Sequence, residues 1–168
     1  HALFERLPPV AADARRTVGT RWLATNATAF ETAQQAAMLD AVLTVLDDPA
    51  HAALFGPGSL AEVPFSALVE GRVVAGAIDR LLVGDNSVQV VDYKTGHAVP
   101  NSVEAVPAGY LRQMAAYAAA LSVIFPGKAI QAALLFTGGP RLIDLSPALL
   151  ALHKPSLAPA NAISADSA

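Results

Sequence analysis

The most informative segment of the chain is Val90-Val91-Asp92-Tyr93-Lys94-Thr95-Gly96, an apolar run that leads into a carboxylate and an amine. The valines before Asp92 are typical of a buried strand. Residues i and i+2 lie on the same face of a strand, roughly 6.6 Å apart along it. We therefore expect the side chains of Asp92 and Lys94 to point in the same direction at the end of this strand.

A second acid, Asp79, lies 13 residues upstream of Asp92. It follows the apolar run over 73–78, and Gly84-Asp85-Asn86 separates the two apolar segments. Such a cluster of turn residues between two strand-like runs is typical of a hairpin. Pairing through this turn would place Asp79 and Asp92 on one face of the sheet.

Two neighbouring carboxylates raise each other's pKa unless a cation sits between them. Mg²⁺ prefers oxygen ligands, keeps several waters and takes only one or two carboxylates. A metal held there would polarise a phosphoryl oxygen and lower the pKa of a bound water. Lys94 would orient or deprotonate that water, or stabilise the negative charge of the transition state. The residues indicate phosphodiester hydrolysis, although an Asp-x-Lys tripeptide by itself is more often a solvated ion pair.

The periodicity of the remaining sequence predicts an α/β layered domain with a mixed sheet. The expected elements are helices over 11–23 and 29–46, a helical turn over 51–55, strands over 60–69, 72–83 and 88–93, a helix over 107–125, strands over 129–136 and 141–144, and a short helix from residue 146. Thr28 is expected to cap the second helix, with Glu31 completing a capping box. Trp22 and Phe30 are expected in the core. The domain is expected to span 1–153, and the Pro/Ala/Ser-rich residues 154–168 to form a disordered tail.

Composition excludes several classes of protein. The chain has no cysteine, which excludes a disulfide framework, a Cys-ligated zinc, an Fe–S cluster and a thiol nucleophile. A net charge of −3 excludes a strongly basic protein that wraps nucleic acid. No apolar run approaches the ~20 residues of a membrane span, so we expect no membrane partner. The start at His1 without an initiator methionine, with only 15% charged residues, favours an excerpt of a longer protein that docks on neighbouring parts.

Three motifs together resemble the RecB-like branch of the PD-(D/E)XK nucleases. They are Gly76-Ala77-Ile78-Asp79-Arg80-Leu81, the segment Val90–Gly96, and Tyr110-Leu111-Arg112-Gln113-Met114-Ala115-Ala116-Tyr117. More narrowly, residues 1–153 resemble the C-terminal nuclease domain of AddA, the helicase–nuclease subunit of the bacterial AddAB complex. The segment over 134–142, which contains Gly138-Gly139-Pro140, is similar to the last hairpin of that domain.

The resemblance implies roles for the central acids and the lysine. Asp79 and Asp92 match the family's metal ligands, Lys94 matches its catalytic lysine, and the backbone carbonyl of Tyr93 matches a further ligand. His1, in His1-Ala2-Leu3-Phe4-Glu5, is similar to a metal-binding histidine of the family. Neutral imidazole is a reasonable ligand beside two carboxylates. The alternative is that His1 is a tag residue or part of a frayed terminus.

Three further residues are candidates for support of the substrate or the metal. Gln113 and Tyr117 match the family's Q-x-x-x-Y, and their i, i+4 spacing places both on one helix face. There they would line the path of the DNA strand or brace the metal site. Glu62 would orient Lys94 or a metal-bound water, or is an ordinary glutamate of an edge strand. His51, His97 and His153 match no motif and are expected in loops or on the surface.

The resemblance implies a PD-(D/E)XK restriction-endonuclease-like core and a Mg²⁺-dependent deoxyribonuclease, with Mn²⁺ able to substitute and Ca²⁺ able to bind without supporting cleavage. As an exonuclease or an endonuclease, it would cut DNA fed by helicase domains of the same polypeptide during double-strand break repair and recombination. It would have a partner of the AddB type and act in the bacterial cytoplasm. AddB itself carries four cysteines for an Fe–S cluster, which this chain lacks.

Two alternatives remain. One is a non-catalytic docking module of the same fold in a helicase complex; the complete set of Asp79, Asp92 and Lys94 argues against such a relic. The other is a stand-alone PD-(D/E)XK nuclease, against which the missing initiator methionine and the apolar composition count.

Overall fold

The computed structural model describes residues 1–95, 98–139 and 141–154. The expectations for Gly96, His97, Pro140 and the tail over 155–168 fall outside these described residues. The helices are α1 Ala2–Arg6, α2 Ala12–Asn26, α3 Thr32–Leu46, η1 Pro49–His51, η2 Val103–Ala105, α4 Ala108–Ile124 and α5 Pro147–Leu152. The strands are β1 Ser59–Val69, β2 Arg72–Val83, β3 Ser87–Lys94, β4 Ala129–Phe136 and β5 Arg141–Leu145. None of the helices in these ranges is long and apolar enough to cross a membrane.

The strands form one five-stranded sheet in the order β1-β2-β3-β4-β5. β3 and β4 pair in parallel, and the other neighbours pair antiparallel. The parallel pair requires a long connection, which α4 supplies. The α/β class and the mixed sheet are therefore confirmed.

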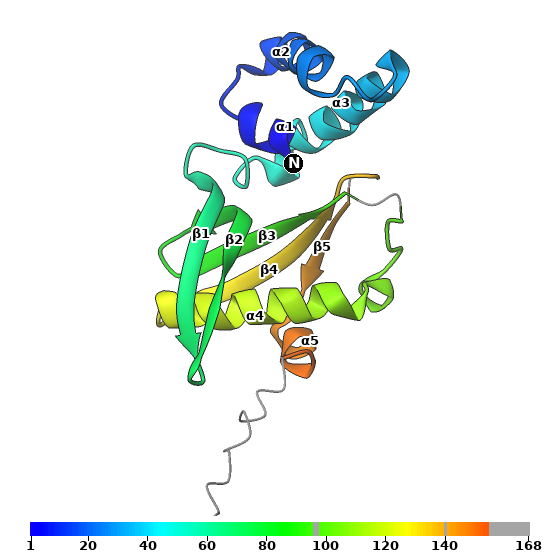
Figure 1. The fold of residues 1–168 in the computed structure, drawn as a ribbon. Coiled ribbons are helices and arrows are strands. Elements are labelled where there is room, and N and C mark those ends of the chain that lie inside the picture. Colours follow the sequence, from blue (N-terminus) through cyan, green and yellow to red (C-terminus); the bar gives the residue numbers. More distant parts are fainter. Residues whose placement is uncertain (96–97, 140, 155–168) are drawn as a thin grey trace, which may run out of the picture.

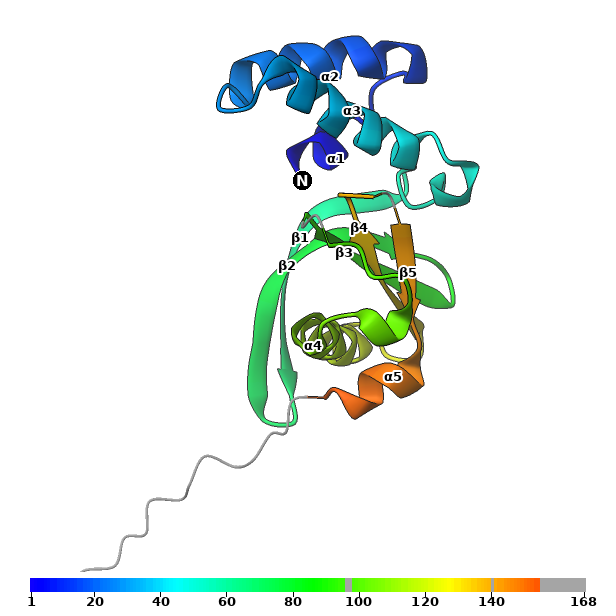
Figure 2. The same ribbon diagram turned by 90° about the vertical axis from the view of Figure 1, so that its right-hand side faces the viewer.

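The sheet lies between two helical layers (Figures 1 and 2). The helices α1, α2 and α3 gather on one side, whereas α4 crosses the other side within the curve of the β1–β2 hairpin. Alternate side chains of β3 point to opposite faces of the sheet. Val91 and Tyr93 pack with α1–α3, and Val88 and Val90 pack with α4. Covering on both faces explains why this strand is an almost continuous apolar run.

The start of α3 differs from the prediction. Its N-cap is Glu31, and the capping box joins Glu31 to Gln34, whose Oε1 accepts from the Glu31 backbone N–H at 3.0 Å. Thr28 is therefore not the cap, because residues 28–30 form the turn that precedes the helix. Phe30 lies in that turn and is 45% exposed, so its expected place in the core is wrong. Trp22 does pack, partly buried, against the α1–α3 core.

Candidate active site

Three acids lie side by side on three neighbouring strands. The β2–β3 pairing ends with Arg80 opposite Val91, so Asp79 and Asp92 are the next residues of the two strands, and the charge of Asp79 acts on Asp92. The β1–β2 register pairs Ala61 with Arg80 and Val63 with Ile78, so Glu62 and Asp79 both lie between these two pairs. The fold therefore brings together carboxylates from positions 62, 79 and 92 of the sequence.

The backbone at Glu62 is in an unfavourable conformation. Glu62 has φ of 49°, and it is left out of the otherwise regular pairing of β1 with β2. The left-handed region costs an L-residue about 1–2 kcal/mol. The charge of the nearby Asp79 also raises the pKa of Glu62, so the two carboxylates repel each other. Backbone strain that persists in a well-ordered fold is typical of functional sites, which supports a chemical role for Glu62.

The tightest group of ligand atoms comes from His1, Glu62 and Asp79. One nitrogen or oxygen of each lies within 4.8 Å of the others. The His1 Nδ1 atom is 3.7 Å from Asp79 Oδ1. Asp79 Oδ2 accepts a hydrogen bond from the Tyr93 backbone N–H at 2.5 Å. This bond fixes the carboxylate and leaves Oδ1 directed toward the imidazole.

Asp92 belongs to a neighbouring network with Lys94. The Lys94 Nζ lies 2.6 Å from Asp92 Oδ2 and donates to Gln113 Oε1 at 2.7 Å. Gln113 Nε2 in turn donates to Asp92 Oδ1 at 3.1 Å and contacts the Tyr117 hydroxyl at the same distance. The i, i+4 pair on α4 thus braces the acid and the amine from below the sheet.

Gly76 has a steric role in this network. The Tyr117 hydroxyl donates to the backbone carbonyl of Ala77 at 3.2 Å, which ties α4 to β2. A Cβ atom on Gly76 would lie 3.4 Å from that hydroxyl and 3.2 Å from Phe65 Cε1. Glycine three residues before Asp79 therefore permits the close approach of the Phe65 ring, which in turn packs edge-on against Tyr117.

Burial makes the ionised acids unfavourable. It is the main cause that raises the pKa of Asp79, although the Tyr93 N–H and Lys94 act in the opposite direction. Burial likewise raises the pKa of Asp92, although Lys94 lowers it. The pKa of Glu62 is also raised, by burial and by the charge of Asp79. Burial also raises the pKa of the Tyr93 phenol to about 12, so that group stays neutral. A nearby cation would relieve the penalty on all three carboxylates.

The residues fit a divalent cation. Asp92 Oδ2 is buried and, among the described residues, accepts no aligned hydrogen bond, although Lys94 Nζ is close to it. Carboxylate oxygens are ligands that suit Mg²⁺ or Mn²⁺. The carboxylates of Asp79 and Asp92, with His1 or Glu62, would hold such an ion.

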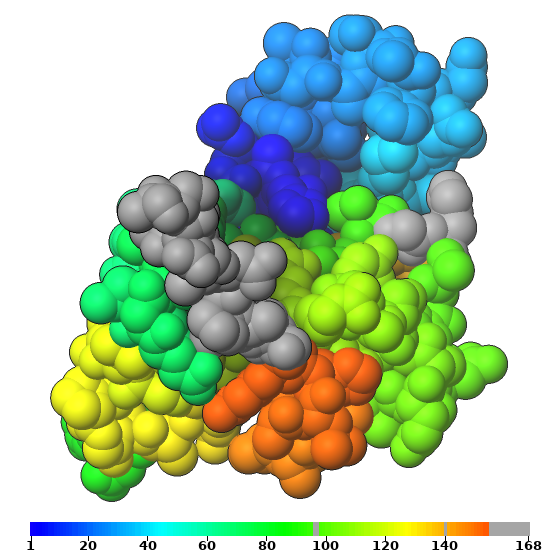
Figure 3. Space-filling view, turned by 60° about the horizontal axis from the view of Figure 1, so that its bottom comes forward, coloured from blue at the N-terminus to red at the C-terminus, as the bar shows by residue number. Residues whose placement is uncertain are grey.

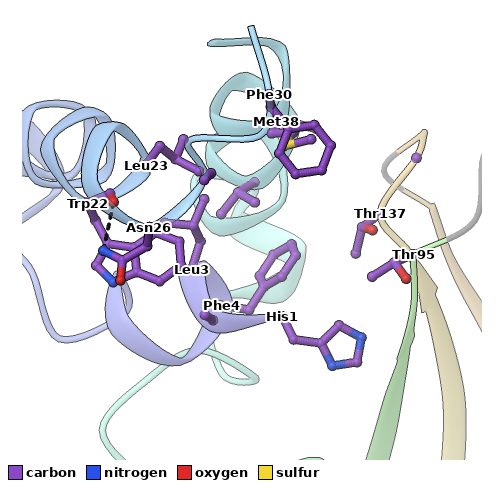
Figure 4. A pocket seen from close by; sticks show the side chains of 15 residues that line it. His1, Leu3, Phe4, Trp22, Leu23, Asn26, Phe30, Met38, Thr95 and Thr137 are labelled. Atoms are coloured by element: carbon purple, nitrogen blue, oxygen red, sulfur yellow. Dashed lines mark hydrogen bonds between the residues drawn. The ribbon is translucent and has the colours of Figure 1, made fainter. Parts of the chain in front are cut away.

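Of the site residues, His1 lines a pocket of about 580 Å³ between the α1–α3 layer and the ends of the strands. His1 extends from α1 into this space, toward Thr95 and Thr137 at the ends of β3 and β4 (Figure 4). The other lining groups are mostly apolar and come from α1–α3. A substrate could therefore approach His1 from the side of the helical layer.

Residues 1–161 match the family described as the PD-(D/E)XK nuclease superfamily. The chain belongs to this superfamily. The PD-(D/E)XK assignment agrees with the mixed sheet, the flanking helices and the placement of Asp92 and Lys94 at a strand end.

Nine chains of solved structures also match. One is titled "Crystal structure of SSO0001", with 14% identity and a TM-score of 0.37. The match covers 68% of this chain and 62% of the other, so this chain spans less than two thirds of that protein. No curated protein matches.

Reasoning from the sequence missed two residues that contact the candidate site. The Lys94 Nζ lies 4.2 Å from the centroid of the Tyr110 ring, a cation–π distance. The signal was available, because Tyr110 precedes Gln113 by three residues and shares its helix face. The second residue is Arg80, whose burial is not evident from its place beside Asp79 in the motif.

The raised pKa of Asp79 predicts how the stability of the metal-free protein depends on pH. A carboxyl whose pKa is raised in the folded state stabilises the fold at pH values below its unfolded-state pKa. This contribution is lost as the pH rises through the folded-state pKa. We therefore expect Asp79→Asn to melt at a higher temperature than the wild type at pH 7 in EDTA, and to vary less with pH. Melting curves between pH 4 and 8 test this. The exposed Asp144→Asn should match the wild type; equal curves for Asp79→Asn and the wild type would contradict the prediction.

Proposed function

We propose that this domain is a Mg²⁺-dependent nuclease that hydrolyses phosphodiester bonds of DNA. The observation that carries the proposal is the convergence of His1, Glu62 and Asp79 within 4.8 Å of one another, beside the Asp92–Lys94 pair. Membership of the PD-(D/E)XK superfamily supports the same reaction. The resemblance of the motifs to AddA further suggests a helicase–nuclease that acts in double-strand break repair and recombination in the bacterial cytoplasm, with a partner subunit of the AddB type.

In this proposal Asp79, Asp92 and the Tyr93 carbonyl hold the metal, with His1 or Glu62 completing the ligand set. When bound, Mg²⁺ polarises a phosphoryl oxygen and lowers the pKa of the attacking water. Asp79 is prepared for this role because the Tyr93 N–H fixes one of its oxygens and leaves the other free.

Lys94 acts on the charge that develops on the phosphoryl oxygens. Its Nζ is held by Asp92 Oδ2, Gln113 Oε1 and the ring of Tyr110, so its position is set before the substrate arrives. A preorganised cation stabilises a developing oxyanion more than a mobile one does. Gln113 is a positioning residue for Lys94, and Tyr117 for Gln113.

A cleavage assay with different metals tests the proposed chemistry. Labelled single-stranded DNA should be cut in Mg²⁺ or Mn²⁺ and remain intact in Ca²⁺ or EDTA. Ca²⁺ should nevertheless compete with Mn²⁺ for binding, because it uses the same oxygen ligands. Cleavage that persists in EDTA would contradict a metal-dependent mechanism.

Delivery of DNA by a helicase predicts weak DNA binding by the isolated domain. Phosphate neutralisation by Lys and Arg dominates such affinity. Arg80 is buried and Lys94 is engaged by Asp92 and Gln113, which leaves Arg112 as the exposed cation of the three motifs. We expect a dissociation constant above about 1 μM for single-stranded DNA at moderate salt, within the range of non-specific binding. Fluorescence anisotropy in Ca²⁺ measures it, and a clearly tighter value would favour a stand-alone nuclease.

A further inference from the structure

Arg80 is a buried cation that contacts the N-terminal helix. Only 4% of this residue is exposed. Its Nε donates to the Tyr93 hydroxyl at 3.2 Å, and its Nη2 donates to the backbone carbonyl of Phe4. The guanidinium carbon also lies 5.1 Å from the centroid of the Phe55 ring. One side chain of β2 thus touches β3, α1 and the segment that follows η1.

Packing alone does not account for a buried arginine at this position. A buried charge costs free energy unless it is paired and hydrogen-bonded. Within the part of the chain that the structure describes, no carboxylate forms an ion pair with Arg80. Well-packed apolar residues often stabilise a core as much as buried charges do. The hydrogen bonds that Arg80 donates to β3 and α1 are therefore the contacts that an apolar residue of similar size could not replace.

The contacts of Arg80 lead directly to His1. Phe4 lies one helical turn after His1, and its N–H donates to the His1 carbonyl at 2.7 Å. The rings of His1 and Phe4 both pack against Tyr93, with centroid distances of 5.5 and 5.0 Å. Helix α1 has only five residues, too few to be stable without tertiary contacts. In the space-filling view it lies between the α2–α3 layer and the strands (Figure 3).

We propose that Arg80 is a positioning residue that holds α1 in place, so that the imidazole of His1 reaches the metal bound by Asp79. The inference rests on the proposed metal-dependent function. Arg80 immediately follows Asp79 in β2, so one short segment carries a metal ligand and the group that positions another. The planar guanidinium reaches two acceptors in fixed directions, which a lysine ammonium does not reproduce.

The test compares Mn²⁺ binding by the full chain and by four variants. Arg80→Met removes the donors and keeps an apolar stem, and Tyr93→Phe removes only one acceptor. His1→Ala removes the imidazole, and the double variant His1→Ala/Arg80→Met reports coupling between the two sites. Titration followed by Mn²⁺ electron paramagnetic resonance gives the dissociation constant, and pulsed measurements detect the coupling of a ligating ¹⁴N nucleus to the metal.

We expect wild-type Mn²⁺ to show the ¹⁴N coupling and His1→Ala to lose it, with affinity about tenfold weaker. Arg80→Met should also lose the coupling and bind about tenfold more weakly, the size of effect typical for partners that orient a ligand. The double variant should bind no more weakly than His1→Ala. Tyr93→Phe should show a smaller loss, and it keeps the test decisive even where Arg80→Met fails to fold. Arg16→Met, which breaks the exposed Arg16–Asp40 pair, serves as the control and should match the wild type.

Retention of the ¹⁴N coupling and affinity in Arg80→Met and Tyr93→Phe, with only a lower melting temperature, would overturn the inference and leave Arg80 a structural residue. Mn²⁺ bound to the wild type without ¹⁴N coupling would overturn it as well, while the proposed nuclease site would stand. No Mn²⁺ binding by the wild type would overturn the proposed function itself, and with it the role of Arg80.

Discussion

An Asp92→Asn variant should lose DNA cleavage by at least about a thousandfold, because metal stabilisation of transition-state charge is worth several kcal/mol and each 1.36 kcal/mol is a factor of ten. The amide retains an acceptor for the bond that Gln113 donates to Asp92 Oδ1. It removes the charge on Oδ2, the buried oxygen that accepts no aligned hydrogen bond from the described residues. Mn²⁺ affinity should fall together with the rate.

The measurement is the initial rate of Mg²⁺-dependent cleavage, with Asp144→Asn as the control that removes an exposed carboxylate from β5. In the proposed helicase–nuclease, Asp92→Asn should leave ATP-driven unwinding intact, because unwinding would depend on the motor domains and not on Asp92. Equal loss of cleavage and unwinding would instead assign Asp92 a structural role.

A Lys94→Met variant should separate the rate from metal affinity. Methionine keeps much of the apolar stem over the Tyr110 ring but has no cation. Loss of one preorganised group that stabilises transition-state charge costs about 10²–10³ in rate. Lys94 is not a ligand in the proposed mechanism, so Mn²⁺ affinity should stay within about threefold of the wild type.

Single-turnover cleavage and Mn²⁺ titration on the same protein provide the two readouts. Gln113→Leu is the companion variant, because it removes the acceptor that holds Nζ at 2.7 Å while the lysine remains. It should show a smaller loss of rate than Lys94→Met. If Lys94→Met abolishes Mn²⁺ binding, the assignment of Lys94 to charge stabilisation is wrong.

The fold was predictable where local patterns dominate. The strands over 59–69, 72–83 and 129–136 agree with their expected bounds because turn residues and apolar runs mark both ends. The start of α3 was not predictable. Two pairs, Thr28 with Glu31 and Glu31 with Gln34, have the spacing of a capping box, and the turn before the helix selects the second pair.

The parts of the candidate site that depend on spacing within a strand or hairpin were predictable from the sequence, whereas contacts between distant segments were less so. The spacing of Asp92 and Lys94, and the hairpin that brings Asp79 toward Asp92, follow from strand geometry. The close approach of Glu62 to His1 and Asp79 depends on a left-handed residue in β1, which no local signal in the sequence marks. The burial of Arg80 depends on contact with α1, more than 70 residues away in the chain.

Crystals of the protein soaked in Mn²⁺, with data collected to reveal anomalous scattering, test the metal site most directly. We predict a peak bound by Asp79 Oδ1 and Asp92 Oδ2, with ligand distances near the roughly 2.1 Å typical of such small divalent ions and the His1 imidazole among the ligands. The absence of a peak at these residues, or carboxylates more than about 8 Å apart and so beyond the reach of one ion, would contradict it.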